Sequence, residues 1–262
     1  MTGKTYPGPD LPFADRRTAG RLLGERLRDT LATSAAPDGR TLVLALPRGG
    51  VPVGCEVAGI LRVPVDVLVT RKIGYPPQPE LGVGAIAEGG APGYDRGVLA
   101  ALRLTPADLS AVAEREQDEL ARQVEVYRAG RPPPDVTGRT VVVVDDGLAT
   151  GVTARAALRA VRARGAARTI LAVPVAPSAS VAAMRTEADE VVVLASPRHF
   201  RSVGEWYVSF GQLTDADVLS LLAQAAARPA DPAQALRPRR GSGRGAAGPA
   251  AALRAKEIRA VA

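Results

Sequence analysis

Cysteine and histidine are almost absent from the sequence, with Cys55 and His199 as the single examples in 262 residues. One cysteine excludes an internal disulfide framework, and the two residues together cannot form a Cys/His zinc site. His199 lies in no nucleophile-elbow sequence, so a Ser-His-Asp hydrolase is not indicated. Neither a long apolar run nor a signal-peptide pattern occurs, and we therefore expect a protein of the reducing cytoplasm without a membrane partner.

Aromatic residues are also scarce, at 3% of the chain, while 46% of the residues are hydrophobic. A sizeable core can therefore form, but it must be built from Ala, Val and Leu. The net charge of +7 is uneven, since residues 226–262 hold eight Arg or Lys and two acidic residues. We predict a folded domain over 1–225 and a disordered, basic tail rich in Ala, Pro, Gly and Arg over 226–262. Because most of the net positive charge lies in the predicted tail and not on the folded domain, nucleic acid is not an expected partner.

Hydrophobic patterning predicts alternating strands and helices. Continuous apolar runs indicate strands at 41–47, 63–70, 140–146, 168–176 and 190–196, and helical spacing indicates helices at 14–32, 51–61, 106–129, 153–165, 178–187 and 214–225. Residues 71–82 have too much Gly and Pro for either element, and 81–90 could pair with 94–99 as a hairpin. The fold class that follows is a doubly wound, mainly parallel α/β sheet with helices on both faces, plus a small hood and a flexible hairpin or loop.

The most informative segment is VVVVDDGLATGVT, which covers residues 141–153. Four valines bring Asp145 and Asp146 to the carboxyl end of a buried strand, where open α/β sheets bind ligands. The backbone N–H groups of the following loop and the start of the next helix can converge on a small anion. The residues expected to bind it are Ala149, Thr150, Gly151, Val152 and Thr153. The carboxylates suit sugar hydroxyls or a divalent cation, and the alternative is a chance acidic turn after a Val-rich strand.

This segment resembles the phosphoribosyl pyrophosphate signature of type I phosphoribosyltransferases, and the resemblance extends over about residues 15–222. In that family the loop after the first core strand holds pyrophosphate and often contains a cis peptide bond. Arg48, Gly49 and Gly50 in ALPRGG match that loop. An arginine can donate two parallel hydrogen bonds to pyrophosphate oxygens, although an ordinary strand-to-helix turn would also explain the sequence.

Two further parts of the family pattern are less specific. The family has a mobile loop near TRKIGYPPQPELG (70–82), which implies that Lys72 reaches pyrophosphate; a solvated surface residue is the alternative. The family's base site is built from a variable hood, which here corresponds to residues 196–218. Aromatic residues of the hood, namely Phe200, Trp206 and Tyr207, could stack on a base, or they could form a packing cluster.

The resemblance implies an enzyme that transfers a phosphoribosyl group between phosphoribosyl pyrophosphate and a nitrogenous base, releasing pyrophosphate, or catalyses the reverse. Arg48, Lys72, Asp145 and Asp146 would be its catalytic residues. Mg²⁺ would bind near the two aspartates, directly or through water and ribose hydroxyls. A non-catalytic sensor of phosphoribosyl pyrophosphate or a nucleotide is the alternative function. The partners are then small molecules, a homodimer is one option, and the acceptor base and the direction of reaction stay open.

Overall fold

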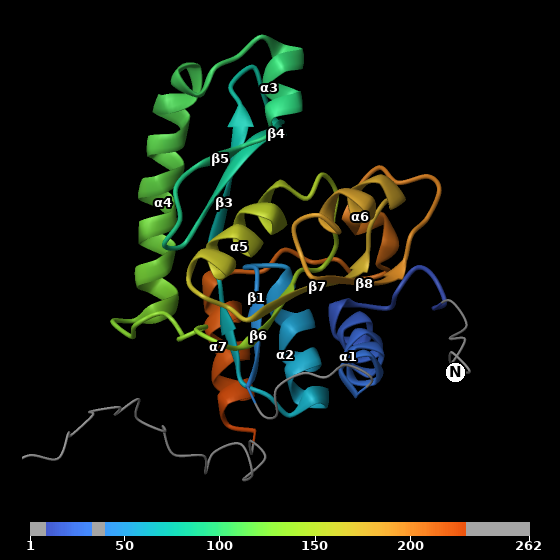
Figure 1. Cartoon of the computed structure of the whole chain (residues 1–262). Coiled ribbons are helices and arrows are strands. Elements are labelled where there is room, and N and C mark those ends of the chain that lie inside the picture. Colours follow the sequence, from blue (N-terminus) through green and yellow to red (C-terminus); the bar gives the residue numbers. More distant parts are fainter. Residues whose placement is uncertain (1–8, 33–39, 229–262) are drawn as a thin grey trace, which may run out of the picture.

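A five-stranded parallel sheet forms the centre of the molecule in the computed structural model, which describes residues 9–32 and 40–228. The strand order is β2-β1-β6-β7-β8 (Figure 1). The strands are β1 (Thr41–Ala45), β2 (Val65–Val67), β6 (Thr140–Val144), β7 (Arg168–Val175) and β8 (Glu190–Ala195). The register aligns Ala45 with Val144, so β1 and β6 end side by side. The predicted parallel α/β sheet is confirmed.

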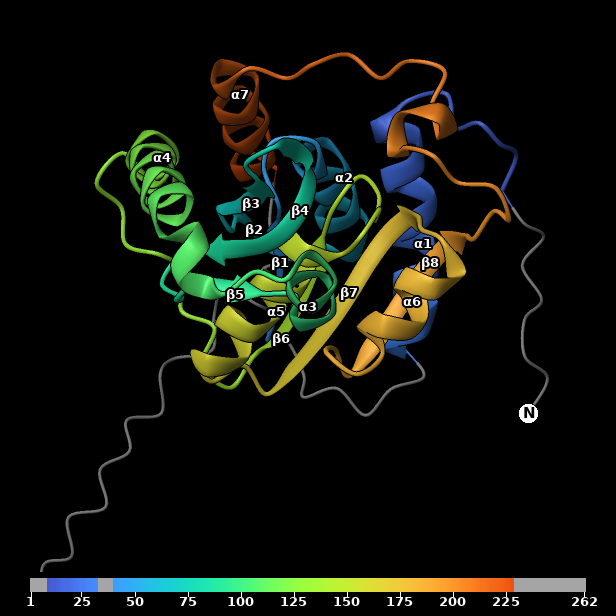
Figure 2. The ribbon, with the colours of Figure 1, turned by 90° about the horizontal axis from the view of Figure 1, so that it is seen from above.

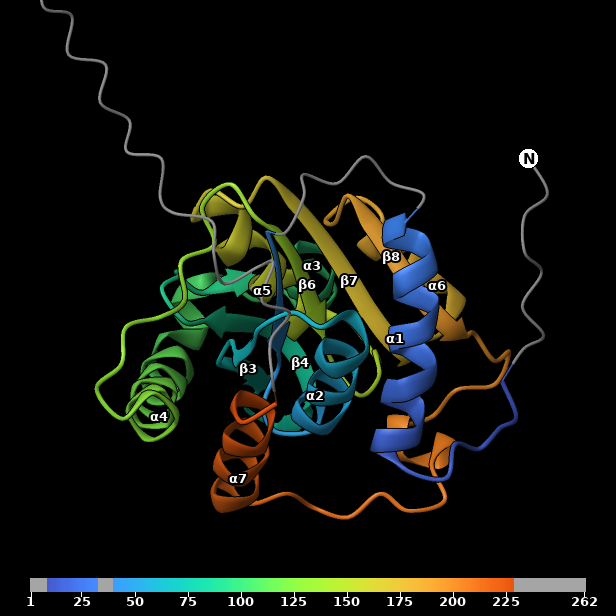
Figure 3. The same ribbon diagram turned by 90° about the horizontal axis from the view of Figure 1, so that it is seen from below.

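Both faces of the sheet are covered, which explains the continuous apolar strands. On one face Val141 and Val143 pack with α5 (Val152–Ala163) and α6 (Ser178–Met184). On the other, Val142 and Val144 pack with α1 (Arg16–Ala32) and α2 (Gly50–Leu61), which lie next to each other beneath the sheet (Figure 3). The lone cysteine, Cys55, is a buried core residue of α2, and burial raises the pKa of its thiol to about 11.

A smaller antiparallel sheet, in the order β3-β4-β5, rises from the main sheet (Figure 1). It comprises β3 (Thr70–Tyr75), β4 (Gln78–Ala87) and β5 (Gly93–Tyr94), and it packs with α4 (Ser110–Arg128) and α7 (Asp215–Ala226) in a second core. The prediction that 71–82 forms neither strand nor helix is wrong. Pro76 and Pro77 occupy the turn between β3 and β4, and the register shifts around Gly74, so the proline and glycine residues are accommodated at a turn and a bulge.

Two strand boundaries also differ from the predictions. The strand expected over 63–70 is divided, because β2 ends at Val67 and Thr70 begins β3. The strand expected at 94–99 is a helix, α3 (Arg96–Leu102), preceded by the two-residue β5. Asp95 accepts hydrogen bonds from the backbone N–H groups of Gly97 and Val98, which makes it the N-cap that ends the strand. The long helix expected at 106–129 starts as a 3₁₀ turn, Pro106–Leu109, and continues as α4.

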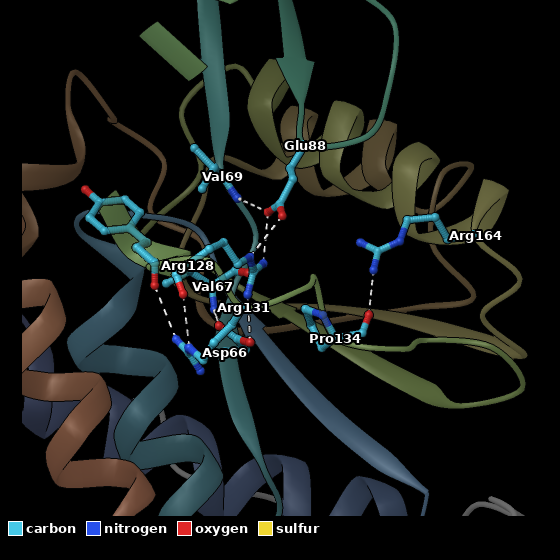
Figure 4. Close-up of polar contacts among 9 residues, drawn as sticks. Asp66, Val67, Val69, Glu88, Arg128, Arg131, Pro134 and Arg164 are labelled. Atoms are coloured by element: carbon cyan, nitrogen blue, oxygen red, sulfur yellow. Dashed lines mark hydrogen bonds and ion pairs between the residues drawn. The ribbon is translucent and has the colours of Figure 1, made fainter. Parts of the chain in front are cut away.

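A buried charge cluster joins the two sheets (Figure 4). Arg128, at the end of α4 and 3% exposed, pairs with Asp66 at 2.7 Å and with Glu88 at 2.9 Å. Its guanidinium also donates to the carbonyl oxygen of Val67 at 2.7 Å. A buried charge without a partner would cost several kcal/mol of stability, so these ion pairs fix the position of α4 and β4 relative to β2.

The described chain ends shortly after α7. Residues 226–228, which the sequence analysis assigned to the tail, complete and follow this helix, and Arg228 donates to the carbonyl oxygen of Cys55. The rest of the predicted tail, 229–262, lies outside the described residues. Among the described residues, no helix is both long enough and apolar enough to cross a membrane.

Candidate functional site

The two aspartates of the valine-rich segment lie at the carboxyl end of β6, at the centre of the sheet. The loop from Asp145 to Gly151, here called the diacid loop, leads directly into α5, which begins at Val152. Gly151 has a φ of 78°, a left-handed conformation that glycine adopts without strain. Thr150 is exposed beside the open N-terminal turn of α5, whose N–H groups are suited to an anion.

The PRGG turn, residues 47–50, lies against the diacid loop because β1 and β6 are neighbours. A Cβ atom added to Gly49 would come within 2.0 Å of the Asp146 carboxylate. One added to Gly50 would come within 2.7 Å of the carbonyl oxygen of Val144. Only glycine permits this approach, so the two sequence motifs form one continuous surface. The peptide bond between Pro47 and Arg48 is cis, as the family resemblance implied.

The two carboxylates share one buried environment. Burial raises the pKa of Asp145 well above its ordinary value, and the nearby charge of Asp146 raises it further. The pKa of Asp146 is also raised by burial, but an ion pair with Arg16 opposes this rise. The Nε atom of Arg16 donates to the carboxylate of Asp146 at 2.8 Å. The negative charge of the two aspartates is therefore only partly compensated. A sugar hydroxyl could donate a hydrogen bond to them, and a cation could neutralise the remaining charge.

Arg48 and Lys72, the two cations expected at pyrophosphate, belong to different elements. The guanidinium of Arg48 extends from the PRGG turn and donates to the carbonyl oxygen of Leu213 at 2.7 Å. Lys72 lies on β3 rather than in a loop, and its ammonium group contacts Glu80 at 3.4 Å. A Cβ atom added to Gly82 would lie 3.2 Å from the Lys72 side chain and 3.8 Å from Val152. Lys72 is therefore on the side of the hairpin that faces the start of α5.

Arg71, the neighbour of Lys72, points the other way. Its guanidinium pairs with Glu116 of α4 at 2.8 Å. Successive side chains of a strand project to opposite faces, which accounts for the difference. This assigns Lys72, rather than Arg71, to the side of the diacid loop.

The phosphoribosyl transferase domain model matches residues 17–204, which include both glycine-containing turns. The chain belongs to the phosphoribosyl transferase family. Proteins of two Mycobacterium tuberculosis strains, provisionally named phosphoribosyl transferases, are 46% identical to it over 213 residues. The match covers 81% of this chain and 47% of each relative, so the chain spans about half the length of these curated relatives.

A solved structure agrees with the family assignment. The crystal structure of the protein TT1426 from Thermus thermophilus is 41% identical and superimposes with a TM-score of 0.68. The match covers 82% of this chain and 99% of that one, so the similarity extends well beyond the two motifs.

In this member of the family, the hood residues expected at the base have different environments. Phe200 and Trp206 stack with ring centroids 6.3 Å apart. Tyr207 is 5% exposed, packs on Phe13, and donates its hydroxyl hydrogen to the carbonyl oxygen of Asp146. Packing therefore accounts for Tyr207, which also supports the diacid loop. Phe200 and Trp206 are only partly buried and pack against the same cluster.

Sequence reasoning did not find Arg16, and it placed Phe210 among the aromatic residues of the hood without foreseeing its contact with Arg16. Arg16 pairs with Asp146 across 130 positions of sequence, and its guanidinium carbon lies 3.7 Å from the centroid of the Phe210 ring. Arg16 looks like one of several arginines at the start of a helix, and no local pattern marks it. The aromatic richness of the hood is the single signal that could have directed attention to Phe210.

The donor set also limits how magnesium could bind. Over residues 9–32 and 40–228, no group of three or more Asp, Glu, His or Cys side chains is arranged to hold a metal ion. Asp145 and Asp146 supply carboxylate oxygens, which Mg²⁺ prefers, but Mg²⁺ commonly takes one or two carboxylates together with substrate phosphates and water. The residues fit an ion that arrives with a phosphorylated substrate.

Proposed function

We propose that this protein transfers a phosphoribosyl group between phosphoribosyl pyrophosphate and a nitrogenous base, releasing pyrophosphate, or catalyses the reverse. The observation that carries the proposal is the contact between the PRGG turn and the diacid loop at the N-terminus of α5. Two anion-binding backbone surfaces and two carboxylates then border one space. A sugar with phosphate at one end and pyrophosphate at the other matches this arrangement.

Each group has a role in the proposed binding mode. The N–H groups of Ala149 to Thr153 bind the 5-phosphate, where the helix dipole favours negative charge. Asp145 and Asp146 accept hydrogen bonds from the ribose hydroxyls. Arg48 leaves the Leu213 carbonyl oxygen and, with Lys72, contacts the pyrophosphate. Magnesium, when bound with the substrate, would neutralise part of the phosphate charge.

The reaction exchanges one bond for another at the anomeric carbon of the sugar. The bond to pyrophosphate breaks, pyrophosphate departs with the electron pair, and a base nitrogen forms the new bond while its proton is lost to solvent. The sugar gains oxocarbenium character between these events. Arg48 and Lys72 stabilise the charge that develops on the leaving group, and positioning and electrostatics supply most of the rate.

A second candidate function is a sensor that binds phosphoribosyl pyrophosphate or a nucleotide without turnover. The observation favouring it is that Arg48 is engaged by the Leu213 carbonyl oxygen, 2.7 Å away, rather than directed into the site. A sensor would use the same phosphate loop and could translate ligand binding into movement of the hood. Phe200 and Trp206 would contact the base of a nucleotide in either function.

Turnover with a panel of bases separates the two functions. The full-length protein is mixed with phosphoribosyl pyrophosphate and Mg²⁺, and each of adenine, guanine, hypoxanthine, uracil and orotate is added in turn, with pyrophosphate release followed by ³¹P NMR. Catalysis by the proposed route predicts base-dependent release that EDTA abolishes. Tight binding of phosphoribosyl pyrophosphate without release in the presence of any base would support the sensor. Absence of both binding and release would contradict the proposed site.

A further inference from the structure

Arg16 connects α1 to the diacid loop through a contact that neither motif contains. The family model begins at residue 17, one position after Arg16. Its Nε atom donates to the carboxylate of Asp146 at 2.8 Å, and the two side chains are only 12% and 13% exposed. A charge pair this shielded from water interacts more strongly than a surface pair, so it fixes the orientation of the carboxylate.

Residues of the hood hold Arg16 in place. The guanidinium lies over the ring of Phe210, 3.7 Å from its centroid, and donates to the carbonyl oxygen of Gly211 at 2.8 Å. The ring of Tyr207 stacks on Phe210 at 5.1 Å, while its hydroxyl donates to the carbonyl oxygen of Asp146. Figure 2 shows the segment after β8 passing the start of α1 before it crosses to α7. Arg16 is thus oriented by a cation–π contact with Phe210 and by the two hydrogen bonds that it donates, one to Asp146 and one to Gly211.

The contacts around Asp146 explain what this arrangement does. Arg16 from α1 donates to the Asp146 carboxylate, and the hydroxyl of Tyr207 from the hood donates to the carbonyl oxygen of the same residue. Side chain and backbone of Asp146 are therefore held by two different segments. An ionised carboxylate can accept several hydrogen bonds, so the contact with Arg16 fixes its orientation and leaves acceptor positions for a ligand.

We propose that Arg16 is a positioning residue for Asp146, which supplies its counter-charge and fixes its carboxylate in one orientation for the ribose hydroxyls. The inference rests on the proposed function for the identity of the ligand. It adds a residue that acts through Asp146 and need not touch the substrate. It also gives the 207–211 part of the hood a role, because that part keeps Arg16 on the acid.

Arg16→Met, Arg16→Lys and the matched control Arg17→Met test the inference. Arg17 is the next residue of α1, is 48% exposed and forms an ion pair with Glu56 at 3.8 Å. Binding of phosphoribosyl pyrophosphate with Mg²⁺ is measured by calorimetry at pH 7. We expect Arg16→Met to lose about tenfold or more in affinity, as for a lost hydrogen bond to a charged group.

The lysine variant separates charge from geometry. Arg16→Lys keeps the charge but cannot contact Asp146 and the Gly211 carbonyl oxygen with one planar guanidinium, so it should restore only part of the lost affinity. Arg17→Met should match the wild type. Unchanged affinity in Arg16→Met would overturn the inference. Tighter binding in that variant would also overturn it, because Arg16 would then compete with the ligand for Asp146.

A measurement without ligand keeps this inference distinct from the proposed function. The carboxyl-carbon NMR signals of ¹³C-labelled aspartates are recorded at pH 7 in the wild type, Arg16→Met and Arg17→Met, after circular dichroism has shown that both variants are folded. The Asp146 signal should move in Arg16→Met and stay in place in Arg17→Met. An unmoved Asp146 signal in Arg16→Met would refute the role of Arg16 even if a ligand binds. A moved signal without any ligand binding would retain the contact and refute the proposed function.

Discussion

Two clusters in this protein each combine one arginine with two acidic side chains, yet they are arranged for different purposes. In the first, Arg128 contacts both Asp66 and Glu88, at 2.7 and 2.9 Å. In the second, Arg16 pairs with Asp146, while no ion pair to Asp145 is found in the described part of the chain. In the first cluster both carboxylates contact the arginine, and the cluster lies between two sheets. In the second, one of the two carboxylates has no ion pair with a described residue, and it lies at the carboxyl end of the central strand.

The difference indicates where ligand binding can supply free energy. In the Arg128 cluster each acidic side chain already has the arginine as its ion-pair partner, so the cluster serves to fix the fold. Burying the Asp145 carboxylate costs free energy, which is why its pKa is raised. A bound sugar or cation can reduce this cost. Perturbed acids at the carboxyl end of a parallel sheet are typical of functional sites. Four variants test this contrast, from the largest expected effect to the smallest.

Arg128→Met should give the largest loss of stability. The change leaves Asp66 and Glu88 buried without their counter-charge, which costs about 3–5 kcal/mol in free energy of unfolding. Urea unfolding measures it. Adding Asp66→Asn and Glu88→Gln should recover part of the loss, while Arg122→Met, at an exposed pair with Glu119, should cost at most about 1 kcal/mol. A loss no greater than that control would mean that the buried cluster does not fix the fold.

Arg48→Ala should reduce turnover about 10²–10³-fold while nucleoside monophosphate affinity stays nearly unchanged. Negative charge grows on departing pyrophosphate in the transition state, whereas the nucleotide product carries no pyrophosphate for Arg48 to contact. Steady-state kinetics and calorimetry on the same variant measure both quantities. Equal losses for turnover and nucleotide binding would point to a collapsed PRGG turn, and an unchanged rate would remove Arg48 from the mechanism.

The double variant Asp145→Asn with Asp146→Asn should lose sugar binding. Each lost hydrogen bond to a charged acceptor is worth about 1.5–3 kcal/mol of binding. The single variant Asp145→Asn, which keeps the Arg16–Asp146 pair, should gain stability at pH 7. Because burial raises the folded-state pKa of Asp145, the wild type loses stability as pH rises from the unfolded pKa through the folded one, so this gain should shrink on acidification. Normal ligand affinity in the double variant would refute the ribose role.

Gly49→Ala should cost about 1–3 kcal/mol of stability and weaken ligand binding, because its Cβ atom would lie 2.0 Å from the Asp146 carboxylate. Gly211→Ala is the matched control, since a Cβ atom there meets nothing within 4 Å and the carbonyl oxygen that binds Arg16 is kept. Thermal unfolding and calorimetry compare the two. If both variants behave alike, the PRGG turn does not depend on close contact with the diacid loop.

The sequence predicted the parallel sheet and its helices because continuous valine runs and helical spacing are local signals. It failed at 71–82, where prolines that usually interrupt structure occupy the turn of a hairpin. The acids and the PRGG turn could be found because each motif is contiguous. The role of Arg16 could not, since its contact with Asp146 depends on the folding of α1 and the hood against the sheet. Local chemistry was predictable, whereas long-range charge compensation was not.

The central claim is that the loop before α5 binds ribose 5-phosphate, and amide NMR tests it most directly. Ribose 5-phosphate is titrated into ¹⁵N-labelled full-length protein with Mg²⁺ present, and backbone assignments identify the signals that move. We predict saturable shifts that are largest for the amides of residues 149–153, with smaller ones at Asp145 and Asp146. Unchanged amides in this loop at millimolar ligand, or saturable shifts confined to another part of the protein, would contradict the account.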